Sequence, residues 1–209
     1  MARRPRFSLL DIPLHVVQRG NNRQPCFLTE SDYAAYAHWL KESASKYDVA
    51  VHAWVFMTNH VHLLVTPKTA DGVSKMMQTL GRYYVRYFNH RHQRTGSLWE
   101  GRFRSCVIDN DAYFMTCQRY IEMNPVRAGM VVSPEEYRWS SYRAHGMGSP
   151  VAMWSPHDLY QQLGSTPAAR IEAYRELVRG NLDDAELRQL RSATNAGGVL
   201  GSLGSEYLL

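Results

Sequence analysis

Two histidines separated by a single residue, His60 and His62, stand in a run of strand-forming residues. Side chains alternate along a β-strand, so both imidazoles are expected on one face and Val61 on the other. Two imidazoles so placed can hold one side of a metal ion, while the apolar residue between them anchors the strand in the core. A chain with nine histidines contains such a pair by chance roughly 0.4 times. The spacing alone therefore fits both a metal site and an ordinary pair at a strand edge.

Tyr120 and Asn124 supply context, because residues four apart lie on one face of a helix. Asn124 offers an amide oxygen as a third metal ligand, and the Tyr120 phenol could attack a phosphorus atom that a metal polarises. Such a site leaves coordination positions open for phosphate oxygens and water, and its ligands suit Mg²⁺ or Mn²⁺. A tyrosine at helical spacing is also commonly a core residue, so spacing leaves the role of Tyr120 open.

The charge of the chain is divided unevenly. Lys and Arg number 24 against 19 Asp and Glu, for a net charge of +5. Residues 1–145 carry a net +7 and residues 146–209 a net −2, and 20 of the 24 basic residues are arginine. The planar guanidinium of arginine fits phosphate groups and guanine edges. The first part therefore suits a nucleic-acid partner, although a solvated basic surface would have the same composition.

Several arginines and one tryptophan are candidate contacts to nucleic acid. Arg82 and Arg86 alternate with tyrosines along a predicted helix, which fits either a strip that follows DNA or a helix with a solvated arginine face. Arg102 and Arg104 form a compact cluster with the nearby Trp99, for which we favour DNA contact. The full candidate set is Arg4, Arg6, Arg19, Arg23, Arg82, Arg86, Trp99, Arg102 and Arg104.

The pattern along the chain predicts the order strand, helix, strand, strand, helix, strand, helix. This order is typical of an α+β sandwich of ferredoxin or RRM type, an antiparallel sheet with helices packed on one face. The strands are expected at residues 14–18, 49–57, 61–66 and 105–108. Helices are expected to begin near residues 29, 71 and 109, and the last should stop at Asn124-Pro125 because of the proline.

A segment rich in Gly, Ser, Pro and Met at residues 146–156 predicts a boundary. We expect a main domain at 1–145 and a helical C-terminal extension with a tail at 146–209, its helices near 168–178 and 183–190. The longest apolar runs have about half a dozen residues, far short of the roughly 20 that cross a bilayer. The start lacks the apolar block of a secretory signal. We therefore expect a cytoplasmic protein without a membrane partner.

Four separated blocks of the sequence together resemble the REP-associated tyrosine transposases. These proteins are relatives of the single-tyrosine insertion-sequence transposases within the HUH endonuclease superfamily. The resemblance spans about residues 8–145, with a weaker echo at 197–204. The blocks are residues 53–65 (AWVFMTNHVHLLV), 86–89 (RYFN), 96–103 (GSLWEGRF) and 119–129 (RYIEMNPVRAG).

The resemblance implies an HUH fold and a metal-dependent single-strand DNA endonuclease and strand transferase acting on palindromic repeats that fold as hairpins. His60 and His62 match the HUH metal ligands, and Asn124 falls where relatives carry Gln or Asn as a third ligand. Tyr120 matches the nucleophile that becomes a 5′-phosphotyrosine. Arginines at residues 3–6 and 19–23 could clamp the foot of such a hairpin. A monomer is favoured, and a dimer remains open.

Three alternatives share some of these features. Replication-initiation proteins and conjugative relaxases use the same histidine pair, but usually on longer chains. An RRM-like module would grip a hairpin without cutting it, and it should carry aromatic pairs on its central strands. A metal-dependent hydrolase of small molecules would not need the excess of arginine to bind its substrate.

Overall fold

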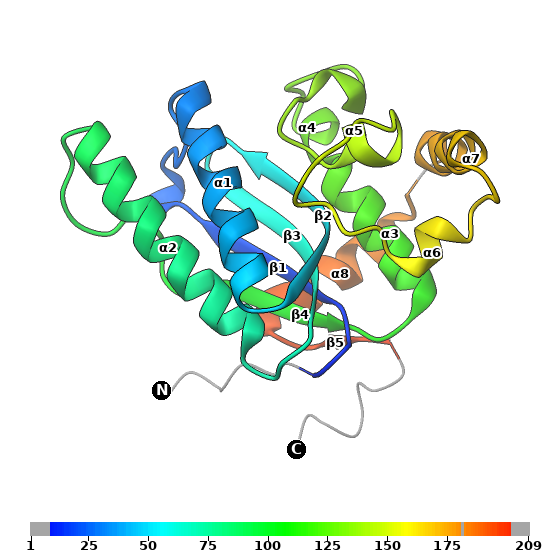
Figure 1. Cartoon of the computed structure of the whole chain (residues 1–209), viewed down its shortest axis with the longest axis horizontal. Helices are drawn as coiled ribbons and strands as arrows, with labels where there is room; N and C mark the ends of the chain where they lie inside the picture. Colours follow the sequence, from blue (N-terminus) through cyan, green and yellow to red (C-terminus); the bar gives the residue numbers. More distant parts are fainter. Residues whose placement is uncertain (1–8, 181, 202–209) are drawn as a thin grey trace.

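The computed structural model describes residues 9–180 and 182–201, which form one five-stranded sheet with helices packed on it (Figure 1). The strands lie in the order β2-β3-β1-β4-β5. The predicted α+β class is confirmed, as is the order of the first four strands and three helices. The strands are β1 (Leu14–Arg19), β2 (Val49–Met57), β3 (His60–Pro67), β4 (Arg104–Ile108) and β5 (Val199–Leu200).

Three helices, α1 to α3, belong to the predicted main domain and are followed there by the short helices α4 and α5, whereas α6, α7 and α8 lie in the extension. The predicted helix near 183–190 is longer than expected and reaches residue 196. The helices are α1 (Glu30–Lys46), α2 (Gly72–Arg91), α3 (Asp111–Glu122), α4 (Asn124–Arg127), α5 (Tyr142–His145), α6 (Asp158–Gln161), α7 (Pro167–Arg179) and α8 (Asp184–Ala196). None of those described is long and apolar enough to cross a membrane.

Side chains alternate along β3 and divide the interior into two apolar cores. Val61 and Leu63 pack with α1 and α2 in one core, whereas Leu64 packs with α3 and α8 in the other. Helices therefore cover both faces of the sheet (Figure 1), and the prediction that they share one face is wrong. The neighbouring β2 is buried along almost its whole length, as strands covered on both faces are.

The edge strand β5 makes the sheet mixed, because it pairs parallel with β4 while the other strands pair antiparallel. Gly197 ends α8 with a φ of 72°, a left-handed conformation that glycine adopts at little cost. The chain then turns toward β4, where the Val107 amide donates to the Gly198 carbonyl at 3.1 Å. The prediction of a purely antiparallel sheet is therefore wrong, since two residues are too few to give a recognisable strand pattern.

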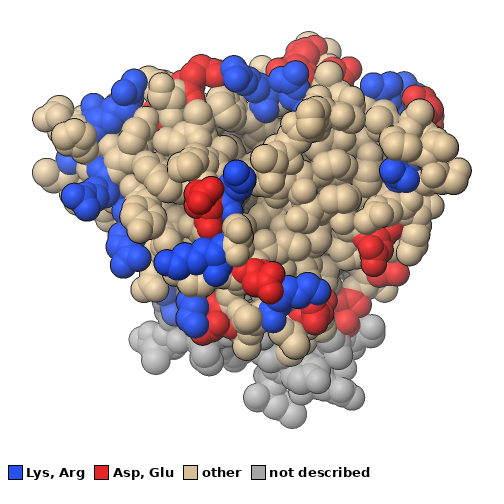
Figure 2. Space-filling model, viewed as in Figure 1, with Lys and Arg blue, Asp and Glu red and all other residues tan. Residues whose placement is uncertain are grey.

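Positive charge gathers over α2. Arg82, Arg86 and Arg91 are exposed on this helix, and Figure 2 shows Lys and Arg predominating over it, on the left of the view. The helix contains no Asp or Glu, so its own sequence does not offset this charge. The basic character expected for the first part of the chain is therefore displayed on its surface.

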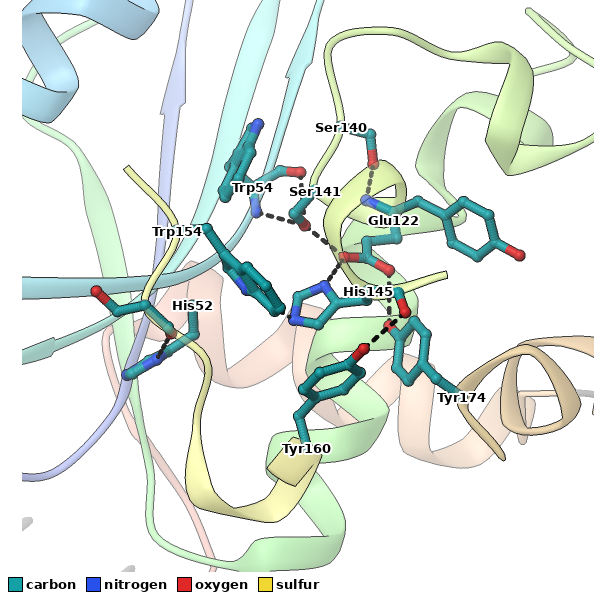
Figure 3. Close-up of polar contacts among 11 residues, drawn as sticks. His52, Trp54, Glu122, Ser140, Ser141, His145, Trp154, Tyr160 and Tyr174 are labelled. Carbon is teal, nitrogen blue, oxygen red and sulfur yellow. Dashed lines mark hydrogen bonds and ion pairs between the residues drawn. The ribbon is translucent and has the colours of Figure 1, made fainter. Parts of the chain in front are cut away.

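A buried carboxylate joins the C-terminal extension to the last turn of α3 (Figure 3). Glu122 is fully buried, and its Oε1 accepts hydrogen bonds from the Ser141 hydroxyl and, at 2.7 Å, from His145 Nδ1. Its Oε2 accepts a bond of 2.6 Å from the Tyr174 hydroxyl of α7. Trp154 Nε1 donates to His145 Nε2 at 3.1 Å, so the ring proton of His145 lies on Nδ1. Sequence reasoning assigns Glu122 no role, but the fold makes it the centre of this cluster.

Replacing Glu122 by glutamine should destabilise the protein. Glutamine keeps the shape but offers one acceptor oxygen in place of two, and its amide would meet groups that donate. Because hydrogen bonds to charged groups contribute about 1.5–3 kcal/mol each, we expect Glu122→Gln to lower the free energy of unfolding in urea by about 2 kcal/mol. Glu172→Gln, on the exposed side of α7, is the control and should change it by less than about 0.5 kcal/mol. Equal stability of the two variants would contradict the prediction.

Candidate active site

His60 and His62 lie at the start of β3 with their rings on the same face of the sheet. The ring centroids are 5.0 Å apart and the planes are inclined by 74°. Val61 points into the opposite core, as the alternation predicted. His62 is buried and His60 is half-buried, so the pair meets solvent on the side of His60.

The hydrogen bonds of His60 fix the position of its proton. Its Nδ1 lies 2.6 Å from Asn59 Oδ1, which can only accept. The Asn59 amide nitrogen in turn donates to the Arg23 carbonyl at 3.1 Å, which sets the orientation of the amide. The proton of neutral His60 is therefore on Nδ1, and Nε2 carries a free lone pair.

A third histidine, His15 on β1, contacts His62. His15 Nε2 lies 2.8 Å from His62 Nδ1, and the two rings stack with centroids 5.1 Å apart. The strand register places Val17 opposite His62, so His15 is its diagonal neighbour on the same face. Sequence reasoning missed His15, because the alternation along one strand does not reveal which residues of another strand it meets.

Burial keeps these three imidazoles neutral near pH 7. Desolvation, together with the smaller effect of the nearby charge of Arg19, lowers the pKa of His60 to about 4. Desolvation also lowers the pKa of His15 to about 3. The pKa of His62 lies well below its ordinary value of 6.5, chiefly through burial and then through its histidine neighbours. Neutral imidazole is the form that binds a metal ion.

Tyr120, near the end of α3, faces these histidines edge to face. Its ring centroid lies 5.6 Å from that of His62 and 6.0 Å from that of His15. The guanidinium carbons of Arg127 and Arg191 stand 5.1 and 5.8 Å from the same centroid. Two cations therefore lie against the ring of Tyr120. Neither arginine was among the predicted site residues, and Arg191 comes from α8 in the extension.

Asn124 begins α4 directly after α3, so the predicted single helix that carries it with Tyr120 is divided. Its amide nitrogen donates to the Tyr120 carbonyl at 2.7 Å and approaches the Ile121 carbonyl at 3.4 Å. Pro125 has no N–H for that second carbonyl, and the Asn124 side chain caps the end of α3 in its place. Because the nitrogen is engaged, Oδ1 is the atom left for another partner.

These side chains offer donors of the kind that bind a divalent metal ion. His60 has an unprotonated Nε2, the neutral ring of His62 lies beside it, and Asn124 adds an amide oxygen of the kind that Mg²⁺ and Mn²⁺ bind. No cluster of three or more His, Cys, Asp or Glu side chains suited to a metal occurs in the described part of the chain. A third protein ligand beside the two imidazoles would therefore be of another type, as the Asn124 amide is.

Three of the predicted DNA contacts surround the solvent-facing end of the site. Arg19, Arg23 and Arg102 are all exposed. Arg19 is paired with His60 in the register of β1 and β3, and Arg23 lies in the turn that follows β1. The loop that carries Arg102 is attached to the same end of β1 by a 2.9 Å bond from the Glu100 amide to the Arg19 carbonyl. Positive charge therefore lines the approach to His60.

Other predicted contacts lie apart from the site. Arg82 and Arg86 are exposed on α2, which packs against the opposite face of the sheet from Tyr120. Trp99 is only 7% exposed and stacks on Tyr84 at a centroid distance of 6.0 Å. Its burial in the core does not favour base stacking, so its contact with DNA stays a prediction without support from its position.

The remaining predicted arginines are Arg104, which contacts the extension, and Arg4 and Arg6, which are near the start of the sequence. Arg104 is exposed on β4, and its Nη1 donates to Asn195 Oδ1 of α8 at 2.6 Å. This bond connects the strand to the extension and occupies part of the guanidinium. Arg4 and Arg6 lie outside the described residues.

Two solved structures and one family model are similar to this chain. A REP-associated tyrosine transposase, solved bound to a REP hairpin, matches with a TM-score of 0.59 and 21% identity, over 75% of this chain and 93% of that one. A putative transposase from Deinococcus radiodurans R1 matches with a TM-score of 0.41 and 20% identity, over 58% of this chain and 96% of that one. No curated protein matches the sequence. The fold is thus that of the REP-associated tyrosine transposase. The family model for IS200-like transposases matches residues 8–124, more than half of the chain, and the protein belongs to this family.

Proposed function

We propose that this protein is a cytoplasmic, metal-dependent single-strand DNA endonuclease and strand transferase that acts on palindromic hairpins. The observation that carries the proposal is the contact between Tyr120 and His62, 5.6 Å between ring centroids, beside a second histidine with a free Nε2. A nucleophile and a pair of metal-binding imidazoles then meet on one face of the sheet. The relative of similar fold was solved with a REP hairpin, which makes hairpin DNA the natural substrate class to test.

The chemistry follows from the side chains around Tyr120. The Tyr120 phenol gives up its proton as its oxygen forms a bond to the phosphorus of one phosphodiester, and the bond from phosphorus to the 3′ oxygen breaks. The 3′ oxygen takes up a proton and leaves as a hydroxyl, while the 5′ end stays on the enzyme as a phosphotyrosine. Arg127 and Arg191, which lie over the ring of Tyr120, would add positive charge beside the phosphodiester during the reaction. Attack of another 3′-hydroxyl on the phosphotyrosine would reverse these bond changes and join two strands.

His60, His62 and Asn124 would hold Mg²⁺ or Mn²⁺. The ion, when bound, would neutralise phosphate oxygens so that the phenolic oxygen can approach the phosphodiester. Arg19, Arg23 and Arg102 would bind the strand on either side of the cleaved bond. Tyr120 contacts His62 of its own chain, which supports a monomer as the active form.

A non-catalytic hairpin-binding module is the main alternative from another class. An RRM-like module binds bases on an open sheet surface that displays aromatic side chains. In this protein α3 and α8 cover the face that bears His62, and α1 and α2 cover the other. Because helices cover both faces of the sheet, its described residues leave no open surface on which bases could stack, and this favours the enzyme over the binding module.

Tyr120→Phe should abolish cleavage and leave hairpin binding within about twofold of the parent. The variant loses only the attacking oxygen, and loss of a nucleophile typically costs more than about 10³-fold in rate. The measurement is the covalent adduct between protein and labelled single-stranded hairpin on a denaturing gel. Tyr113→Phe is the matched control, because Tyr113 lies on the same helix and bonds to Gln189. Adduct formation by Tyr120→Phe but not by Tyr113→Phe would assign the nucleophile to Tyr113 instead.

His62→Ala should abolish cleavage, and EDTA should do the same to the unaltered protein. The reason is that the phosphodiester oxygens would no longer be neutralised. His38→Ala, which removes an exposed histidine of α1, should cleave at the parent rate. Asn124→Ala should reduce cleavage less than His62→Ala, because both imidazoles remain. Full cleavage in EDTA would remove the metal from the mechanism.

Binding should favour a single-stranded hairpin over a blunt duplex of equal length and should weaken steeply with salt. Each phosphate contact contributes about 0.7–0.9 to the slope of log affinity against log salt. Replacing Arg19, Arg23 and Arg102 together by glutamine should lower that slope by about 2. Arg179→Gln, in a surface ion pair on α7, should leave the slope unchanged. An unchanged slope in the triple variant would show that the strand does not pass these arginines.

A further inference from the structure

The extension contacts the candidate active site through a buried hydroxyl. Thr194, on α8, is only 5% exposed. Its Oγ1 lies 2.8 Å from the Leu190 carbonyl, 2.9 Å from His15 Nδ1 and 3.2 Å from Cys106 Sγ. His15 in turn bonds to His62, so a continuous chain of hydrogen bonds runs from the backbone of α8 to a candidate metal ligand.

The Leu190 carbonyl, which can only accept, determines the direction of every hydrogen bond in this series. A carbonyl oxygen cannot donate, so the single hydroxyl proton of Thr194 is given to Leu190. The Thr194 oxygen must then accept from His15, which places the His15 proton on Nδ1. Neutral His15 consequently accepts at Nε2, and His62 must donate from Nδ1. The lone pair of His62 is therefore left on Nε2.

We propose that Thr194 and His15 are positioning residues that hold His62 in the tautomer that leaves Nε2 free to bind the metal ion. The extension helix α8 is then a part of the active site, although it lies beyond the residues that match the family model. This inference rests on the proposed function for its catalytic meaning, but the tautomers themselves are a property of the metal-free protein. Histidines that bind metals commonly have their other ring nitrogen engaged in this manner.

The placement of α8 is fixed by contacts on both sides of Thr194. Asn195 accepts the bond from Arg104 of β4, and β5 follows the helix directly into the sheet. At the other end of the helix, Glu186 accepts a 3.2 Å bond from Thr116 of α3. Arg191, three residues before Thr194 and hence on the same side of the helix, stands over the Tyr120 ring. One helix therefore touches both the nucleophile and the histidine chain.

Loss of the Thr194 hydroxyl should reverse the direction of the hydrogen bond between His15 and His62. In Thr194→Val the shape is kept, but His15 Nδ1 has no acceptor for its proton. His15 can then donate only from Nε2, toward His62, whose proton would have to move from Nδ1 to Nε2. The lone pair that would bind the metal ion would be lost without any change at the ligand itself.

The direct test is the tautomeric state of the histidines in the full-length, metal-free protein near pH 7. Long-range ¹H–¹⁵N spectra of ¹⁵N-labelled imidazoles distinguish a proton on Nδ1 from one on Nε2. We expect Nδ1 protonation for both His15 and His62 in the unaltered protein and in Thr194→Ser, which retains the hydroxyl. We expect His62 to change to Nε2 protonation in Thr194→Val. Nε2 protonation of His62 in the unaltered protein, or an unchanged His62 in Thr194→Val, would overturn the proposal.

Affinity for Mn²⁺, measured by calorimetry without DNA, provides the second measurement. Substitution of a residue that orients a metal ligand typically weakens binding about 10–100-fold, and we expect this loss in Thr194→Val and in His15→Leu. Thr194→Ser should bind within about threefold of the parent. Thr116→Val is the matched control, because it removes another buried threonine contact to α8 outside the chain of histidines. Equal loss in Thr116→Val and Thr194→Val would reduce Thr194 to a packing role.

These results separate this inference from the proposed function. If Tyr120→Phe still cleaved DNA, the nucleophile would be wrong, but the tautomers and the Mn²⁺ affinities would still report on Thr194 and His15. If instead the tautomers were unchanged in Thr194→Val while Tyr120→Phe was inactive, the enzyme would stand and the role of α8 would be refuted.

Discussion

The hydrogen bond between His62 and His15 is the interaction on which the arrangement of the candidate site depends. Strand alternation places His62 in the core formed with α3 and α8, where it is only 5% exposed. A buried ring nitrogen without a partner would cost about 1–3 kcal/mol. His15, diagonal to it on β1, supplies the partner at 2.8 Å, and Thr194 supplies the partner for His15. The same bonds that satisfy the buried rings also determine which nitrogen is left for chemistry.

Much of this site could be predicted from the sequence, because its central residues occur at short, regular spacings. The pair His60 and His62 is visible from strand alternation, and Tyr120 with Asn124 from helical spacing and family resemblance. Their neighbours His15, Arg191 and Thr194 could not be found in this way. His15 depends on the register between two strands, and the other two depend on how α8 packs. Contacts between residues so far apart in the chain leave no local pattern.

The fold shows the same division between local and distant determinants. The four main strands and their helices were predictable, because β2 and β3 are long apolar runs joined by a short turn and α3 begins at a capping Asn110. The two-sided burial of the sheet was not, since a strand that is apolar throughout does not show how many helices cover it. The parallel edge strand β5 was missed because its place is set by Gly197 and by the packing of α8 rather than by strand length.

The covered sheet also constrains how a DNA strand could reach Tyr120. The tyrosine is only 6% exposed, and His62 and His15 beside it are 5% and 1% exposed. The open side of this cluster is the half-buried His60, at the end of β1 where Arg19, Arg23 and Arg102 are exposed. A phosphodiester would have to enter from that end, since α3 and α8 close the face elsewhere. The positive charge of α2 lies across the sheet from Tyr120, so under the proposed function it would meet a part of the hairpin away from Tyr120. Under the proposed function, the position of His60 would thus separate arginines that could touch the cleaved strand from those that could attract other parts of the DNA.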